Sequence, residues 1–598
     1  MIEEIKDKKL SRRQFVGTAA GSAAALGAGA ILAPAFASAA GATPARPAEA
    51  GATANSLQPA SAATAQSNVP TSWDYQADVI VVGAGAAGQV AAIAAARGGS
   101  SVLVVEANYD VGGHAMLAGG HMDQMGPPSQ VFASLTAAST PYQDRALSNV
   151  YANNMPRLFY WLISNGMVLS SSGSTYIPCT TLPTTMISVY AQYEGVIANG
   201  AAFTPSIESP GGRGDTALVR TMENTARSIG VQYLLNWKMT GIVREQPYGG
   251  NVLGITANAT GGRFLPGSTT PLQSWKSLGN VNLQLSTANI RANKAVIICD
   301  GGHSSNPARR EEFDFRQTGV YHAAGEPFSF QNGDGEYAAR RVGAALWATG
   351  NEADFGSAIT VPGRIGCEYQ YANLHWTPGS PIFPLARASG LAVSNFADII
   401  QVNMAGARFI AENATGYTWL NAAMAINAAS AEPDFAAGPV WAIFDSAAVT
   451  REGWTLGSPN TDPLFFYQAN DLPTLAQQIN SNAYQTTPMS GAVLQATVTR
   501  YNSLVAAGKG DTDFGKTTFN QQINTPPYYA AFDTPVLHDC LTGVRMDTGA
   551  RVVDLDANPI PHLYVAGESA GGFAVHGLTK CMVFALIAGT NAAQEPTQ

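Results

Sequence analysis

The sequence carries little charge for its length. Only 13% of its 598 residues are Asp, Glu, Lys or Arg, about half of the roughly 25% that is usual in globular proteins. The 33 basic residues are outnumbered by 42 acidic ones, which gives a net charge of −9, and no run of five or more basic residues occurs. A nucleic-acid partner is therefore not expected.

Cysteine is also scarce, and its spacing excludes several architectures. The chain has five cysteines, an odd number, and contains no CxxC or CxxCH sequence. A disulfide scaffold, a zinc ribbon and a covalent c-type haem are therefore disfavoured. The histidines show no spacing typical of metal ligands, so we expect no metal site. Apolar residues (46%) and 61 glycines are plentiful, which favours a large, tightly turned α/β enzyme.

The N-terminus has the features of an export signal. Residues 11–16 read SRRQFV, an apolar run rich in Ala and Gly follows, and AFASAA at 35–40 offers small residues for a signal peptidase. Residues 1–39 resemble a twin-arginine signal peptide, and residues 40–71 are predicted to be a disordered linker. We expect export by the twin-arginine machinery to the periplasm or the outside. An uncleaved membrane helix is the alternative, which the glycines disfavour.

Residues 78–106 have the pattern of a dinucleotide-binding βαβ unit. An apolar strand at 79–82 leads into a GxGxxG turn and a helix of small residues, and a second strand at 102–105 ends in an acid. The glycines let the backbone approach a pyrophosphate at the helix N-terminus, and the acid can accept hydrogen bonds from ribose hydroxyls. The expected contacts are Gly83, Gly85, Ala86, Ala87, Gly88, Glu106 and Ala107.

Six further stretches resemble, in order, the fumarate reductase and succinate dehydrogenase flavoprotein family, whose relatives include 3-ketosteroid dehydrogenases and urocanate reductase. The resemblance covers about 75–598 and implies FAD as the cofactor. It rests on EANYDVGGHAMLAGG (106–120), AVIICDGGHSSN (295–306), QNGDGEYAARRVGA (331–344), VNMAGARFIAE (402–412), the segment 527–554 and PIPHLYVAGESAGG (559–572).

The resemblance also implies how FAD is held. We expect non-covalent binding, because the spacing from His114 to the following glycine pair is one residue shorter than in membrane-bound relatives that attach FAD to a nearby His. Covalent attachment at His114 is the alternative. The implied cofactor contacts are Gly112, Gly113, His114, Gly119, Gly120, Asp300, Gly301, Gly302, Asp334, Gly567, Glu568 and His576.

The order of these stretches implies an α/β architecture. A Rossmann-like FAD-binding domain in two parts, 72–355 and 536–598, would flank an inserted α+β capping domain at 356–535 that covers the substrate. The alternation of apolar residues predicts a hairpin within 230–258. An amphipathic pattern predicts a helix at 211–230, packed beneath that hairpin.

The expected chemistry pairs hydride exchange at flavin N5 with proton transfer at the neighbouring carbon. By resemblance, Arg408 is the proton donor, with Glu412 as its relay. Since arginine holds its proton near neutral pH, Arg408 could instead anchor a substrate carboxylate or form a structural ion pair. His375 and His538 are expected to contact substrate, with packing as the alternative. Tyr529 could polarise a ketone or pack in the core.

The segment 571–589 departs from the family pattern. Fumarate reductases carry there an Arg that holds the second carboxylate of fumarate, and this chain has none. We therefore predict an exported enzyme that transfers hydride between FAD and a CH–CH or C=C bond beside a carbonyl or carboxylate, with a small organic substrate other than fumarate. Its electron partner would be a cytochrome, a quinone-linked protein or O₂. The alternatives are a flavin oxidase or dehydrogenase acting on another bond, such as CH–OH, and a non-catalytic FAD electron-relay subunit.

Overall fold

A computed structural model describes most of the chain from residue 69 onward. The described residues are 69–137, 143–171, 177–192, 215–262, 284–304, 306–313, 324–325, 331–347, 352–354, 364–365, 390–393, 396–412, 424–427, 434–437, 439–458, 460–533, 536–573, 575 and 577–598. The predicted signal peptide, most of the linker, His375 and His576 lie outside them. Among the described residues, no helix is both long and apolar enough to cross a membrane.

An eight-stranded sheet forms the centre of the FAD-binding part. Its path runs β23-β24-β9-β1-β2-β6, and all neighbours from β24 to β6 are parallel. The predicted strands are confirmed, and the near-continuous apolar runs of β1 and β2 are buried, as expected for a covered parallel sheet. The bounds are β1 Tyr75–Val82, β2 Val102–Glu106, β6 Gln232–Leu235, β9 Thr287–Ile298, β23 Arg551–Val553 and β24 Pro559–Val565.

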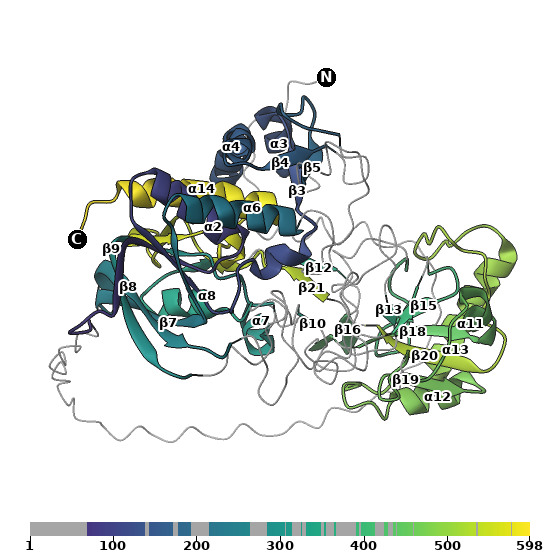
Figure 1. Cartoon of the computed structure of the whole chain (residues 1–598). Coiled ribbons are helices and arrows are strands. Elements are labelled where there is room, and N and C mark those ends of the chain that lie inside the picture. Colours follow the sequence, from purple (N-terminus) through teal and green to yellow (C-terminus); the bar gives the residue numbers. More distant parts are fainter. Residues whose placement is uncertain are drawn as a thin grey trace, which may run out of the picture. The chain divides into compact units, whose positions relative to one another are not determined.

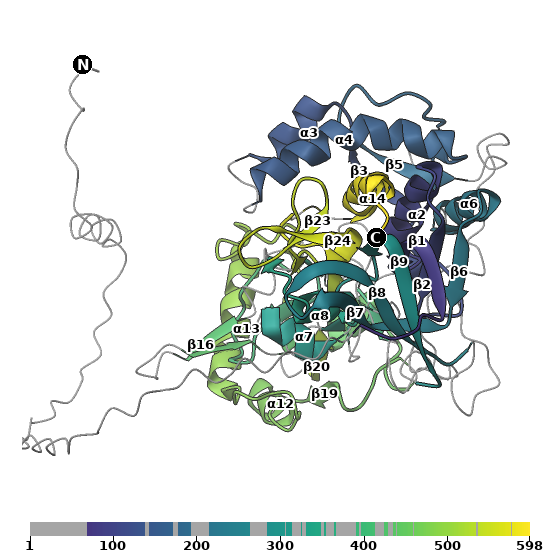
Figure 2. The ribbon, with the colours of Figure 1, turned by 90° about the vertical axis from the view of Figure 1, so that its left-hand side faces the viewer.

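Helices α2, α6 and α14 lie together over one face of this sheet (Figures 1 and 2). Helix α2 directly follows β1, and α14 closes the chain against it. Small residues permit this close packing, since a Cβ on Gly589 would lie only 2.2 Å from the Ala91 carbonyl oxygen. The bounds are α2 Ala86–Arg97, α6 Asp215–Ser228 and α14 Gly577–Gln594.

The predicted hairpin exists, but its extent and its neighbours differ from the expectation. Residues 232–235 form β6, a parallel strand of the main sheet, and the antiparallel hairpin consists of β7 (Trp237–Gln246) and β8 (Gly249–Ala259). The predicted amphipathic helix, α6, packs mainly against α2 rather than beneath the hairpin. Its apolar face fits either position, so periodicity alone did not determine the partner.

Smaller elements follow the main sheet. Two are the 3₁₀ turns η1 (Gly113–Leu117) and η4 (Gly567–Ser569), which carry predicted cofactor contacts. The others are β3 His121–Met125, α3 Pro128–Leu135, α4 Arg145–Ser164, β4 Val168–Ser170, β5 Ile187–Gln192, α7 Pro307–Phe313, β10 Ala324–Gly325, α8 Asp334–Arg341, β11 Leu346–Trp347, β12 Glu352–Asp354, β21 Val536–Asp539 and β22 Gly543–Val544.

The chain between 364 and 533 forms separate sheets. A four-stranded antiparallel sheet, β15-β18-β20-β19, has its own apolar core, and aspartates or a serine cap its helices. The mixture of helices with antiparallel strands is what the inserted α+β domain predicts, although its exact boundaries stay a prediction. The bounds are β13 Arg364–Ile365, β14 Leu391–Ala392, β15 Ile400–Val402, β16 Met424–Asn427, β17 Asp434–Ala437, β18 Val440–Asp445, α11 Ser446–Glu452, β19 Phe466–Ala469, α12 Leu472–Ile479, α13 Gly491–Ala507 and β20 Tyr528–Asp533.

Candidate cofactor and active site

The glycine-rich turn between β1 and α2 is built for close backbone approach. Gly83 has a φ of +95°, and a Cβ there would lie 2.4 Å from the Cys299 carbonyl oxygen. A Cβ on Gly88 would lie 1.9 Å from the Gly83 carbonyl oxygen. Gly85 caps α2 without a side-chain hydrogen bond, so the first-turn N–H groups can serve an anion such as a pyrophosphate.

Glu106 ends β2 beside this turn. Its Oε2 accepts a hydrogen bond from the Ala84 N–H (2.6 Å) and its Oε1 accepts one from the Asn108 N–H (2.8 Å). Burial raises the pKa of this carboxyl, although the backbone hydrogen bonds act in the opposite direction. Because each carboxylate oxygen can accept more than one hydrogen bond, Glu106 retains the capacity to bind ribose hydroxyls.

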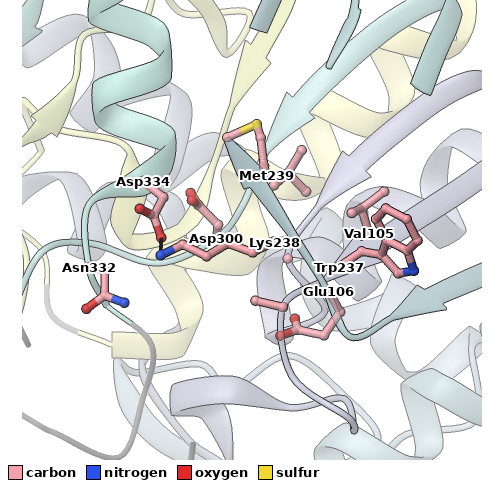
Figure 3. A pocket seen from close by; sticks show the side chains of 11 residues that line it. Val105, Glu106, Trp237, Lys238, Met239, Asp300, Asn332 and Asp334 are labelled. Carbon is pink, nitrogen blue, oxygen red and sulfur yellow. Dashed lines mark ion pairs between the residues drawn. The ribbon is translucent and has the colours of Figure 1, made fainter. Parts of the chain in front are cut away.

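A cavity opens at the carboxyl ends of β1, β2 and β9 (Figure 3). Five predicted cofactor contacts line it: Gly83, Glu106, Ala107, Asp300 and Asp334. Figure 3 shows Lys238 reaching across it toward Asp334. Four residues that were not predicted also line the cavity: Trp237, Lys238, Met239 and Asn332. The first three begin β7, and the predicted hairpin did not indicate which cavity its strands would line.

Asp300 joins the end of β9 to the start of α8. Its Oδ2 accepts a hydrogen bond from the Gly335 N–H (2.7 Å), and its Oδ1 accepts one from the Ser569 hydroxyl (3.1 Å). Burial, followed by the charges of Asp334 and Glu336, raises the pKa of Asp300 to about 7. The carboxyl therefore titrates in the neutral range while holding two elements together.

The stretch from Gly112 to Gly120 folds back onto the glycine-rich turn. The Gly112 N–H donates to the Ala84 carbonyl oxygen (3.0 Å), and Gly112 itself has a φ of +125°. Gly113, Gly119 and Gly120 also have positive φ, which glycine adopts readily. The segment thus returns to Gly85, with which Gly112 forms a β-bridge, and it lies beside the glycine-rich turn.

His114 lies in a cluster with Glu568 and Asp539. His114 Nδ1 is 3.0 Å from Glu568 Oε2, and the ligand atoms of all three residues lie within 4.8 Å of one another. Burial raises the pKa of Glu568, which the neighbouring Asp539 carboxyl raises further and His114 opposes. The three groups are close enough to share a proton or a cation. Asp539, which also accepts from the Gly577 N–H at the start of α14 (3.0 Å), was not predicted.

Gly301, Gly302 and Gly567 are three further predicted cofactor contacts. Gly301 and Gly567 have positive φ, and a Cβ on Gly302 would lie 2.3 Å from the Cys540 Cβ. A Cβ on Gly567 would lie 3.0 Å from the Ala87 Cβ, at the first turn of α2. The bare helix N-terminus, the acid after β2 and the close glycines together fit a dinucleotide such as FAD.

Arg408 lies in a buried ion-pair cluster, which we call the Arg408 cluster: Arg408, Glu412, Asp511 and Lys516. Its Nε and Nη2 donate to Glu412 (2.7 and 2.9 Å), and Nη2 also donates to Asp511 (2.8 Å). The Arg408 side chain is 5% exposed, and those of its two carboxylate partners are fully buried.

Aromatic rings and charge leave Arg408 few free contacts. The rings of Tyr501 and Phe514 lie 5.1 and 5.0 Å from its guanidinium carbon. Burial alone lowers the pKa of Arg408, but the hydrogen bonds and charges of Glu412 and Asp511 outweigh burial and raise the pKa. A raised pKa opposes proton donation. Of the three roles weighed for Arg408, this geometry favours the structural ion pair.

The other predicted catalytic residues are less defined by the structure. Tyr529 lies in β20, 6% exposed, and stacks on Phe444 with a centroid distance of 5.4 Å. That contact favours its packing role. His538 lies in β21, but its side chain, like His375, is outside what the structure describes.

Comparison with known proteins decides the family. The sequence profile of the FAD binding domain matches residues 78–579. This chain belongs to the fumarate reductase and succinate dehydrogenase flavoprotein family. It is an FAD-dependent oxidoreductase.

The similar proteins have different named activities. The fumarate reductase (cytochrome) of Shewanella frigidimarina is 26% identical over 546 residues, covering 86% of this chain and 77% of that protein. Digoxin reductase of Eggerthella lenta is 25% identical over 574 residues, covering 90% and 91%. The structure of 3-ketosteroid Δ1-dehydrogenase from Sterolibacterium denitrificans, 21% identical, has a TM-score of 0.58 and covers 87% of this chain and 99% of its own. The last comparison supports the fold alone.

Proposed function

We propose that this flavoprotein is exported and acts on a CH–CH or C=C bond beside a carbonyl or carboxylate, in a substrate other than fumarate. The observation that supports the cofactor part is the cavity in which five predicted residues meet, four at or just after the ends of β1, β2 and β9 and one at the start of α8. Bound FAD supplies the hydride chemistry at N5. The chain's own contribution is to hold the dinucleotide through Glu106, the glycine-rich turn and the α2 N-terminus.

The arrangement of cations argues against a dicarboxylate. Lys580, the one Lys or Arg in the segment 571–589, is 2% exposed, and its Nζ lies 3.5 Å from the Cys540 carbonyl oxygen. Arg408 is bound to two carboxylates within its own cluster. Asp539 places a carboxylate at the N-terminus of α14, where the helix would otherwise attract an anion. Among the described residues, these positions supply no second carboxylate anchor, and we infer a substrate other than a dicarboxylate such as fumarate.

We further propose that Arg408 stabilises the inserted region rather than donating a proton. His375 and His538 stay the predicted substrate contacts. For electrons, we propose an external cytochrome or quinone-linked protein, because relatives include a cytochrome-named fumarate reductase. The predicted twin-arginine signal places this exchange outside the cytoplasm.

A panel of alkenes tests the proposed function. The signal-free holoenzyme would be reduced without oxygen and mixed separately with fumarate, urocanate, a cinnamate and a cyclic enone, while the absorbance of oxidised flavin is followed. We expect rapid reoxidation by urocanate, the cinnamate or the enone and little by fumarate.

The outcomes separate the candidate functions. Reoxidation by fumarate alone would contradict the inferred lack of a second carboxylate anchor. Failure of every alkene with fast reoxidation by air would favour the oxidase alternative. FAD that is bound but reoxidised by neither would favour a relay subunit, and cytochrome c would then be tried as the acceptor.

A further inference from the structure

An ion pair spans the cofactor cavity. Lys238 Nζ lies 3.0 Å from Asp334 Oδ2, with the two side chains 21% and 34% exposed (Figure 3). Lys238 comes from β7 and Asp334 is the first residue of α8. The pair therefore joins two elements that are separate in sequence, at a place where solvent can reach it.

Lys238 is also the cation that balances this cavity. Among the described residues that line it, Lys238 stands alone against three carboxyls, Glu106, Asp300 and Asp334. The pyrophosphate of FAD adds further negative charge nearby. Since like charges in a partly desolvated cavity repel one another, a neutralised Asp334 makes the cavity more favourable for the cofactor.

Strand β7 holds α8 at both ends. At the far end, Arg244 Nη1 donates to the Val342 carbonyl oxygen (2.6 Å), and Nε donates to the Gly250 carbonyl oxygen (3.0 Å). Arg244 does not line the cavity, whereas Lys238 does. If the Lys238–Asp334 pair opened, α8 would stay attached through Arg244 at one end and through the hydrogen bond from the Gly335 N–H to Asp300 at the other. Only the Lys238 and Asp334 side chains would then move away from the cavity wall.

We propose that the Lys238–Asp334 ion pair is a latch that slows release of FAD. The inference rests on the proposed cofactor site. The latch takes no part in hydride transfer: it closes one wall of the cavity, and its strength depends on ionic strength because both side chains are partly exposed.

The test measures FAD release from the holoenzyme. Protein would be diluted at low and at high salt, and the FAD that passes a filter retaining the protein would be followed with time. In the wild type, high salt should speed release about two- to five-fold, the range expected for a partly exposed pair. Lys238→Met should release FAD about as fast at low salt as the wild type does at high salt, and high salt should no longer speed its release.

Two further variants make the result specific. Arg500→Met removes a cation whose partner, Asp513 (2.8 Å), lies far along the chain from the cavity residues, and it should leave release unchanged. The exchanged pair Lys238→Asp with Asp334→Lys should recover slow release and salt dependence. Recovery would exclude general damage to β7 as the cause of fast release.

Failure of the latch and failure of the site give different results. Unchanged release and salt dependence in Lys238→Met would overturn the latch. If Glu106→Ala nevertheless loses FAD, the cofactor site is supported even though the latch is not. Full FAD retention in both variants would overturn the site itself, and the latch with it.

Discussion

Two clusters of buried or half-buried charge differ in how they are balanced. The Arg408 cluster has two cations and two carboxylates, all closely paired. The cavity at the ends of β1, β2 and β9 has three carboxyls and one lysine. Charge that is fully paired needs no further partner, whereas the cavity retains acceptors for the hydroxyl groups of a ligand.

The comparison also shows what the structure adds to the three roles expected for Arg408. An Arg in a GxRF sequence with an acid four residues later fits a proton relay, and it fits an i,i+4 ion pair equally well. The structure adds a second partner, Asp511, about a hundred positions later in the chain, and this second pairing favours the ion pair. No local pattern connects the two residues.

Removing Arg408 should have the largest effect. Arg408→Ala would leave Glu412 and Asp511 buried with Lys516 as their remaining cation, and we expect a loss of about 3–5 kcal/mol in the free energy of unfolding. Denaturant unfolding of the holoenzyme would measure it. Arg500→Ala, which breaks a partly exposed pair between α13 and Asp513, should change stability little. Normal stability with abolished turnover in Arg408→Ala would instead favour the acid or anchor role.

Removing Glu106 should weaken the binding of FAD and leave the stability of the inserted region unchanged. Glu106→Ala deletes a carboxylate that organises the Ala84 N–H and that we expect to bind the ribose. A hydrogen bond to a charged group contributes about 1.5–3 kcal/mol, so FAD affinity should fall about ten- to hundred-fold. The flavin absorbance per protein after purification gives the occupancy, and Glu106→Gln should retain more FAD than Ala. An alanine variant with full yellow absorbance would contradict the role assigned to Glu106.

The cofactor half was more predictable than the substrate half for a physical reason. One βαβ unit contains Gly83, Gly85, Gly88 and Glu106. Local strand and helix patterns were therefore enough to predict that these residues lie close together. Asp300 and Asp334 were added by the family resemblance of the stretches 295–306 and 331–344. Trp237 and Lys238 were missed, since a hairpin pattern predicts strands but not which cavity they line.

Catalytic roles in the inserted region depend on packing that sequence spacing does not encode. Tyr529 has the residue type that could polarise a ketone, yet it stacks on Phe444 from the adjacent strand β18. Conversely, Asp539 stands beside the predicted His538 and was overlooked, although its carboxylate caps α14. The position of Asp539 next to His538, a predicted substrate contact, was the signal from which it could have been predicted.

Asp300 supplies the smallest and most specific test of the cavity's charge. Its pKa is raised from 3.8 in the unfolded chain to about 7 in the folded protein. The folded state therefore holds the proton more tightly, so the stabilisation from this group is fully present below about 4 and is lost as the pH rises toward 7.

Asp300→Asn should remove this pH dependence. Relative to the wild type, the variant should gain on the order of 1–3 kcal/mol between pH 4 and 7, because its amide is uncharged at every pH. The readout is the difference in melting temperature between variant and wild type across that range, with Asp471→Asn, an exposed helix cap on α12, as the control. A difference in melting temperature that does not change with pH would mean that Asp300 is already ionised at pH 4. That result would contradict the raised pKa of Asp300.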